Sequence, residues 1–168
     1  MFKKEYLSSY LRWGIISAIA FCIPMIIFLT QKDYAATWWL FVGNALFLVV
    51  IAMYMLAFNK GQNENASTQT MLAVGHTATV VGILVSCIAA LILLFVFVPD
   101  IFSSGTSESA LPDAPAQTGT GKTHGLIFFL FMNATIGNFF GGSFASIIIP
   151  YTARKNQTKD KKTEVLNN

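Results

Sequence analysis

Four long runs of this chain contain no Asp, Glu, Lys or Arg. A helix of about 17–25 predominantly apolar residues crosses the roughly 30 Å hydrocarbon core of a bilayer, and each run is near or above that length. The runs are Trp13–Leu29, Trp38–Phe58, Met71–Val98 and Gly125–Ile149. Charged residues make up 11% of the chain, whereas they make up about a quarter of a typical globular domain. Almost nothing remains to build a water-soluble domain.

These features predict an all-α fold, namely an integral membrane four-helix bundle formed by a single domain, residues 1–168. The spans are expected at about residues 13–30, 38–58, 71–98 and 125–149. Residues 99–124 are rich in Ser, Thr, Gly, Pro and Ala and lack hydrophobic periodicity, which predicts an external loop. Residues 151–168 are expected to form a basic cytoplasmic tail.

The distribution of Lys and Arg predicts the orientation of the spans, because cytoplasmic loops of membrane proteins carry an excess of these residues. If both termini are cytoplasmic, nine cations lie inside, and only Lys32 and Lys122 lie outside. The nine are Lys3, Lys4, Arg12, Lys60, Arg154, Lys155, Lys159, Lys161 and Lys162. We therefore expect both termini and residues 59–70 inside, and the long loop outside.

The fourth run carries two interleaved ridges of small residues, each with four-residue spacing. One ridge contains Asn133, Gly137, Gly141 and Ala145, and the other contains Ala134, Asn138, Gly142 and Ser146. Residues four apart lie on one helix face, and small residues there allow another helix to approach closely in lipid. The ridges predict a packing face, with Gly137, Gly141, Gly142, Ala145 and Ser146 as the main helix-packing candidates.

Two other runs carry ridges of the same kind. The first run has Gly14, Ala18 and Cys22 at this spacing, and the third has Ala78, Gly82, Ser86 and Ala90. We expect the third-run ridge, with Gly82 and Ser86 as packing candidates, to pair with the ridge of the fourth run. Packing within the chain can then use most of the small-residue surface, so the sequence does not require self-association.

Three asparagines lie at membrane depth: Asn44, Asn133 and Asn138. We interpret them first as interhelical hydrogen-bonding residues, each contributing roughly 0.6–2 kcal/mol. The alternative is that they line a narrow polar pathway in an oligomer. His76 is a further polar candidate, interpreted as an interface residue anchored by hydrogen bonds beside Thr77 and Thr79. The expected topology separates it from His124 by about a membrane thickness, so the sequence predicts no metal site and no cofactor.

The segment Ala116–Thr123, AQTGTGKT, resembles the phosphate-binding loop of helicase-type ATPases. In that loop, backbone N–H groups bind the phosphates, Lys reaches them and Thr holds magnesium, and a buried strand precedes the loop. Here Leu111–Pro115 contains two prolines where the strand is required, and a membrane span follows. We interpret the match as coincidence and expect no nucleotide binding.

The four runs lack the ionisable groups that coupled transporters place in the membrane to bind or relay ions. No histidine is expected at the same depth as a carboxylate, so no nucleophile, base and orienting group come together. The sequence therefore predicts a protein that is not an enzyme. Its expected partners are the lipid bilayer and either further copies or a larger membrane complex. The basic tail lacks interleaved aromatic residues, so nucleic-acid binding is not expected.

The layout resembles that of small, uncharacterised four-span inner-membrane proteins of bacteria. The shared points are a short basic arm before Leu11-Arg12-Trp13-Gly14, a hydrophilic loop between the second and third spans, and a small-residue fourth span before a basic tail. The resemblance implies a multi-pass protein of the bacterial inner membrane, and it assigns no activity or functional residue.

Our leading interpretation is a non-enzymatic structural or interaction subunit. The alternative is a passive pore or transporter component that acts as an oligomer.

Overall fold

A computed structural model describes residues 6–31, 33–62, 66–99 and 121–153, the first five residues of the last range as backbone only. Throughout these residues the regular structure is helical. Four helices are long and apolar enough to cross a membrane. The first three are α1 (Leu7–Gln31), α2 (Trp38–Gly61) and α3 (Thr68–Phe97). The fourth is composed of α4 (Gly121–Met132), a π-helical segment η5 (Asn133–Gly137) and α5 (Asn138–Thr152), and a 3₁₀ turn, η2 (Tyr34–Thr37), precedes α2.

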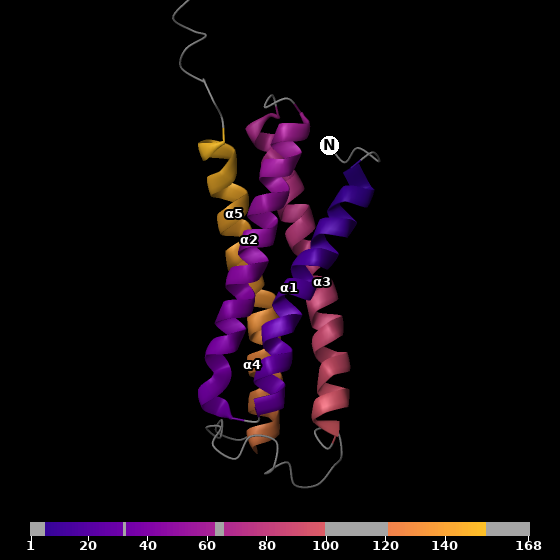
Figure 1. Cartoon of the computed structure of the whole chain (residues 1–168), viewed down its shortest axis with the longest axis vertical. Coiled ribbons are helices and arrows are strands. Elements are labelled where there is room, and N and C mark those ends of the chain that lie inside the picture. The colour runs from indigo at the N-terminus through magenta and orange to yellow at the C-terminus, as the bar shows by residue number, and fades with distance from the viewer. Residues whose placement is uncertain (1–5, 32, 63–65, 100–120, 154–168) are drawn as a thin grey trace, which may run out of the picture.

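Successive helices run in opposite directions, so α1 begins and α5 ends at the same end of the bundle (Figure 1). Helix α1 packs against α2 and α3, and α5 packs against the same two helices. Helices α2 and α3 also contact each other. The fourth helix therefore closes a bundle whose centre lies between α2 and α3.

The helices extend beyond the predicted spans. Helix α1 begins at Leu7, and aromatic contacts support this first part: the ring centroids of Tyr6 and Phe58 lie 5.2 Å apart, and those of Trp13 and Tyr54 lie 5.5 Å apart. At the other end of the chain, α5 continues past Pro150 to Thr152. Helix α4 includes residues 121–124, so the predicted external loop ends earlier than expected. Residues 100–120 of that loop and the tail from 154 onward lie outside the described residues.

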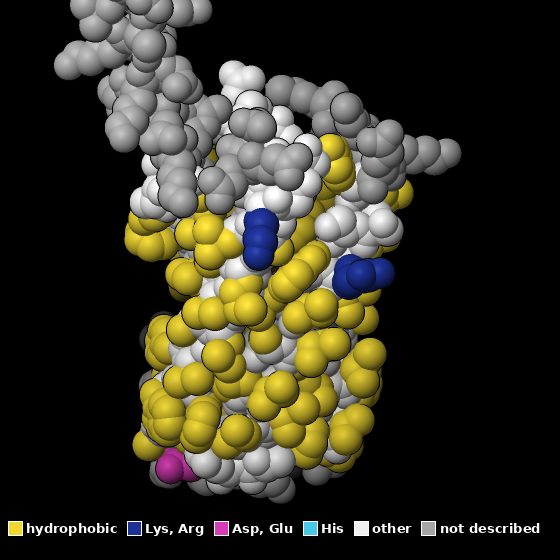
Figure 2. Space-filling model, turned by 45° about the horizontal axis from the view of Figure 1, so that its top comes forward, with side chains coloured by type: hydrophobic (Ala, Val, Ile, Leu, Met, Phe, Trp, Pro, Cys, Tyr) yellow, Lys and Arg dark blue, Asp and Glu magenta, His cyan; other side chains and the backbone are white. Residues whose placement is uncertain are grey.

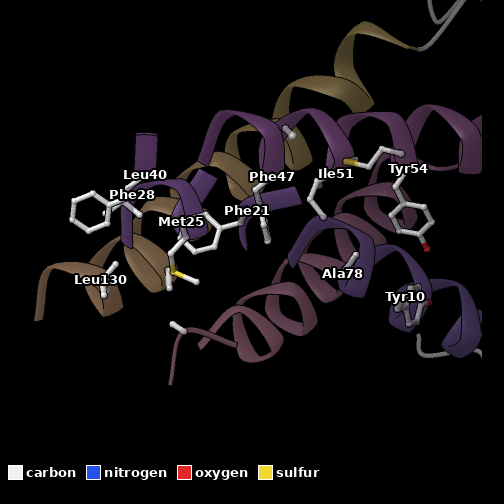
Figure 3. Close-up of a cluster of buried hydrophobic side chains, with 14 of the residues drawn as sticks. Tyr10, Phe21, Met25, Phe28, Leu40, Phe47, Ile51, Tyr54, Ala78 and Leu130 are labelled. Atoms are coloured by element: carbon white, nitrogen blue, oxygen red, sulfur yellow. The ribbon is translucent and has the colours of Figure 1, made fainter. Parts of the chain in front are cut away.

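A row of large apolar side chains fills the bundle along its length (Figure 3). Phe21, Phe47 and Ile51 have no exposed surface, and Tyr54 is 1% exposed. Leu130 of α4 is also fully buried, so the fourth helix contributes to the same core. The outward side chains are mostly apolar too, and they cover much of the face seen in Figure 2.

Glycines mark the places where α1, α2 and α3 approach most closely. A Cβ atom on Gly43 would lie 3.0 Å from the carbonyl oxygen of Phe21, and one on Gly14 would lie 3.0 Å from that of Ala78. A Cβ atom on Gly82 would lie 2.5 Å from Ser17 Oγ and 2.7 Å from the ring of Phe47.

The expected pairing of Gly82 with the fourth span is therefore wrong, because the nearest atoms to this position belong to α1 and α2. An α-helix turns by about 100° per residue, so a ridge of residues four apart rotates by about 40° at each step. The ridge faces α1 at Ala78 and Gly82. Its later members, Ser86 and Ala90, consequently point away from α1. Helix α5 meets α3 instead at Gly75 and Thr79.

The close approach at Gly82 gives a first prediction. We expect Gly82→Ala to lower the free energy of unfolding by about 1–3 kcal/mol, because the added methyl group overlaps Ser17 and Phe47. Gly61→Ala is the matched control, since nothing lies within 4 Å of a Cβ atom there. That variant should be unchanged or more stable by up to about 1 kcal/mol. Equilibrium unfolding in mixed micelles, followed by tryptophan fluorescence, measures both. Equal stability of the two variants would contradict the prediction.

Candidate functional site in the fourth span

The fourth span is interrupted by the π-helical segment η5, which the sequence did not lead us to expect. A π-helix places one extra residue in a turn, and such segments occur frequently at functional sites. Three polar side chains at this level bond to backbone carbonyl oxygens four residues earlier. Asn133 Nδ2 donates to Phe129 O at 3.0 Å, Thr135 Oγ1 to Phe131 O at 2.6 Å, and Asn138 Nδ2 to Ala134 O at 3.1 Å. Bonds of this kind compete with the backbone hydrogen bonds of an α-helix. The closely spaced Asn133, Thr135 and Asn138 were therefore the sequence feature that could have indicated an interruption of the helix.

The first small-residue ridge of the fourth span faces α2, and Asn44 lies at the centre of the contact. Asn44 Nδ2 donates a hydrogen bond of 3.1 Å to Asn133 Oδ1. A Cβ atom on Gly137 would meet the Asn44 amide, with Oδ1 at 2.9 Å, and one on Gly141 would lie 3.4 Å from the Asn44 carbonyl oxygen. Three residues of one ridge thus surround a single side chain and its backbone.

The second ridge faces α3. A Cβ atom on Gly142 would overlap the side chain of Thr79, and Ser146 Oγ and Cβ occupy the space beside Gly75. Ala134 is fully buried in the same ridge, and Ala145 of the first ridge is 3% exposed. The hydroxyl groups of Thr79 and Ser146 donate to carbonyl oxygens of their own helices, at 2.8 and 2.7 Å. The interface between α3 and α5 is therefore held by close packing of small residues.

The hydrogen bond between Asn44 and Asn133 joins two helices that are distant in the sequence, as we had interpreted these residues. Asn133 is 7% exposed and Asn44 is half-buried. The second acceptor in this group, Asn44 Oδ1, is buried and has no hydrogen-bond partner in the described part of the chain. The pair is therefore only partly satisfied.

Asn138 is the most deeply buried of the asparagines, with no exposed surface. The predicted interhelical hydrogen bond is not formed here: its amide nitrogen bonds to its own helix, and its Oδ1 has no partner among the described residues. Ser86 is also fully buried, and its hydroxyl group is unpaired there too. A buried polar group without a hydrogen bond costs about 1–3 kcal/mol. These two unpaired groups therefore lower the stability of the folded bundle.

His76 lies apart from the asparagines. Its ring is half-buried, and Nδ1 is 3.0 Å from Leu72 O of the same helix. Thr77 and Thr79 bond to their own backbone carbonyls and not to the histidine. The side chain of His124 is outside the described residues. Among the side chains that are described, no group of three His, Cys, Asp or Glu could hold a metal ion.

Only part of the phosphate-loop-like segment, residues 116–123, is described by the structure. Residues 116–120 lie outside the described chain, and the backbone of 121–123 forms the first turn of α4. The described residues include no strand that could deliver such a loop.

The side chains around η5 are chemically uniform. The polar ones are uncharged amides and hydroxyls, which donate and accept hydrogen bonds or offer oxygen atoms to a cation. Their nitrogen atoms are engaged: Asn44 Nδ2 with Asn133, and Asn133 Nδ2 and Asn138 Nδ2 with backbone oxygens. The amide atoms without a hydrogen-bond partner are oxygens, namely Asn44 Oδ1 and Asn138 Oδ1.

The Asn44–Asn133 bond gives a second prediction. In a double-mutant cycle with Asn44→Ala and Asn133→Ala, we expect a coupling energy of about 0.6 kcal/mol and at most about 1.7 kcal/mol, the range of interhelical bonds in membranes. Unfolding of the single and double variants in mixed micelles measures it. Asn44→Ala combined with Thr152→Ala, whose hydroxyl bonds only to its own helix, is the control and should be additive. Additivity of the asparagine pair would show that the bond contributes nothing.

The chain matches no family model, no curated protein and no solved structure. Its functional assignment therefore rests on the geometry around η5 and on the surface of the bundle.

Proposed function

We propose that the protein is a four-span protein of the bacterial inner membrane with both termini in the cytoplasm, and that it acts as a non-enzymatic structural or interaction subunit. The observation that carries this proposal is the distribution of polar and apolar groups. The buried polar residues and the close-packed glycines lie between the helices beside the apolar core, and the outward face is also covered by large apolar side chains. This is the arrangement that lipid favours and water disfavours.

The outward surface supports a lipid environment. Phe140, Val96 and Leu84 are 68%, 65% and 60% exposed, and similar side chains cover every long helix. The largest apolar patch on a typical water-soluble monomer is only about 300–600 Å². In lipid such side chains carry no penalty, and each helix satisfies its own backbone hydrogen bonds.

Aromatic residues gather near both ends of the bundle, as they do at membrane interfaces. At one end Trp38 and Trp39 stack with ring centroids 4.1 Å apart, and at the other Trp13 stacks on Tyr54. Trp38 and Tyr54 are sixteen residues apart on α2. At about 1.5 Å per residue they are separated by about 24 Å along the helix, a little less than the roughly 30 Å hydrocarbon core.

The orientation is supported by the charges. The two described cationic side chains, Arg12 and Lys60, belong to the beginning of α1 and the end of α2, which lie at the same end of the bundle. Figure 2 shows dark-blue basic groups towards that end of the visible face and a magenta acidic group at the other. The sequence adds the basic tail to the same side, because α5 also ends there.

Fusion reporters test the orientation. We expect alkaline phosphatase fused after Val165 to be inactive and green fluorescent protein at the same position to fluoresce, because both termini are cytoplasmic. Phosphatase inserted after Ala110, in the long loop, should be active. Activity of phosphatase at Val165 would overturn the topology.

The role of a structural or interaction subunit is supported by how the interior is used. The buried hydroxyls of Ser17, Thr79 and Ser146 bond to their own helices, and the small-residue ridges pack within the chain. These features stabilise a compact scaffold. A partner would bind on the lipid-facing surface or at the ends of the helices.

The second candidate is a pore or transporter component, and a specific observation favours it. The fully buried Asn138 keeps an unpaired oxygen beside a π-helical interruption of the span. Transporters place binding sites at interrupted membrane helices.

Two measurements on the tagged full-length protein separate the candidates. A structural subunit should copurify in mild detergent with a defined membrane partner, and liposomes containing only this protein should show no ion or solute flux. A transporter component should produce flux that drops at least tenfold in Asn138→Leu. Asn59→Leu is the matched control, because Asn59 also has a buried, unpaired amide oxygen but belongs to the end of α2. Flux that survives Asn138→Leu would exclude this site from the pathway.

A further inference from the structure

Three unpaired polar atoms gather around η5. The described residues contain six buried side-chain polar atoms without a hydrogen-bond partner, and three of them are Asn44 Oδ1, Ser86 Oγ and Asn138 Oδ1. Asn44 touches η5 directly through Asn133 and Gly137. Asn138 is the residue that follows η5 in the chain.

Ser86 comes from α3, and the helix register places it at the same level. Thr79 of α3 packs against Gly142, and Gly75 packs against Ser146, so the two helices are antiparallel. Ser86 is seven residues, or about two turns, beyond Thr79 on nearly the same face. Going the same distance back along the fourth span from Gly142 leads to η5, which itself packs against α3.

The unpaired atoms define what the site can bind. The amide nitrogens of Asn44 and Asn138 already donate hydrogen bonds, and their oxygens accept none. A guest must therefore be a hydrogen-bond donor or a cation. Each unpaired atom is buried, so a guest must be small. A sodium ion without its hydration shell is smaller than water and coordinates amide, hydroxyl and carbonyl oxygens.

The backbone of η5 adds carbonyl oxygens to this chemistry. Asn133 O and Thr135 O accept the Asn138 backbone N–H, and Ala134 O accepts from Asn138 Nδ2. A carbonyl oxygen has two lone pairs, and in transporters the carbonyls of interrupted helices coordinate sodium ions near the middle of the bilayer. Neutral oxygens alone suffice for a monovalent cation, as carbonyl rings do in potassium channels.

We propose that η5, together with Asn44, Ser86 and Asn138, forms a binding site for a small monovalent cation of the sodium class. The proposal deepens the transporter candidate by naming its ion. Because no acidic residue lies in the spans, the occupied site carries a net positive charge.

The test uses the purified full-length protein in detergent, with unfolding followed by tryptophan fluorescence in sodium chloride and in choline chloride of equal concentration. A ligand that binds only the folded state raises the melting temperature with its concentration. We expect sodium at about 100 times its Kd to raise the melting temperature by at least about 5 °C. Lithium should act similarly. Potassium should act less, because it requires longer distances to oxygen.

Ser86→Ala is the diagnostic variant, and Ser143→Ala is its matched control. Both remove a buried, unpaired hydroxyl, but Ser143 lies beyond η5 on another face of α5. We expect Ser86→Ala to lose at least half of the sodium-dependent shift and to be no less stable than the wild type in choline chloride. Ser143→Ala should keep the full shift. A variant that merely disturbs packing would be less stable in both salts.

Three results would overturn the proposal: equal melting temperatures of the wild type in sodium and choline, a full sodium shift in Ser86→Ala, or an equal loss in both serine variants. Asn138→Ala, which removes an amide oxygen from the same site, should also lose part of the sodium-dependent shift in melting temperature. The fusion reporters are independent of the cation, so a negative result here leaves the proposed topology standing.

Discussion

The close approach of η5 and α5 to both α2 and α3 is the contact on which the rest of the structure depends. Helix α1 also touches α2 and α3, so the bundle is closed only when α5 covers their other side. Glycines make this possible, because a side chain at Gly142 would collide with Thr79 and one at Gly137 would collide with Asn44. Small surfaces and dispersion forces hold helices together in lipid, where the hydrophobic effect gives them no preference for each other. The same closeness buries the amides around η5.

The existence of four helices and their apolar character could be predicted from the sequence, because length and absence of charge determine both. The small residues of the fourth span were also identified as a set. Four-residue spacing could not predict which neighbouring helix each ridge faces. The ridge containing Gly137 faces α2 and the ridge containing Gly142 faces α3, while Gly82, expected to face the fourth span, faces α1 and α2. Which neighbour a stripe meets depends on tilt and register, and these are set by all four helices together.

The candidate site was predictable only in part. Asn44, Asn133 and Asn138 were recognisable as polar groups at membrane depth, and a hydrogen bond between helices was the first interpretation of them. The π-helical segment was not expected, because the periodicity of small residues around it is compatible with an uninterrupted α-helix. The polar side chains that bond to the preceding turn, Asn133, Thr135 and Asn138, were the available signal. The unpaired oxygen atoms depend on three helices meeting, so they are a property of tertiary structure alone.

The polar content of the fourth span has a consequence for biosynthesis. This span is the least apolar of the four, and it is also the last to leave the ribosome. In the proposed membrane setting, an isolated helix carrying Asn133 and Asn138 enters lipid poorly, whereas α2 and α3 offer it Asn44, Gly75 and Thr79 as partners. The first three helices would then act as a template on which the last one is accepted. The helix that depends most on its neighbours is thus the one that is made after them.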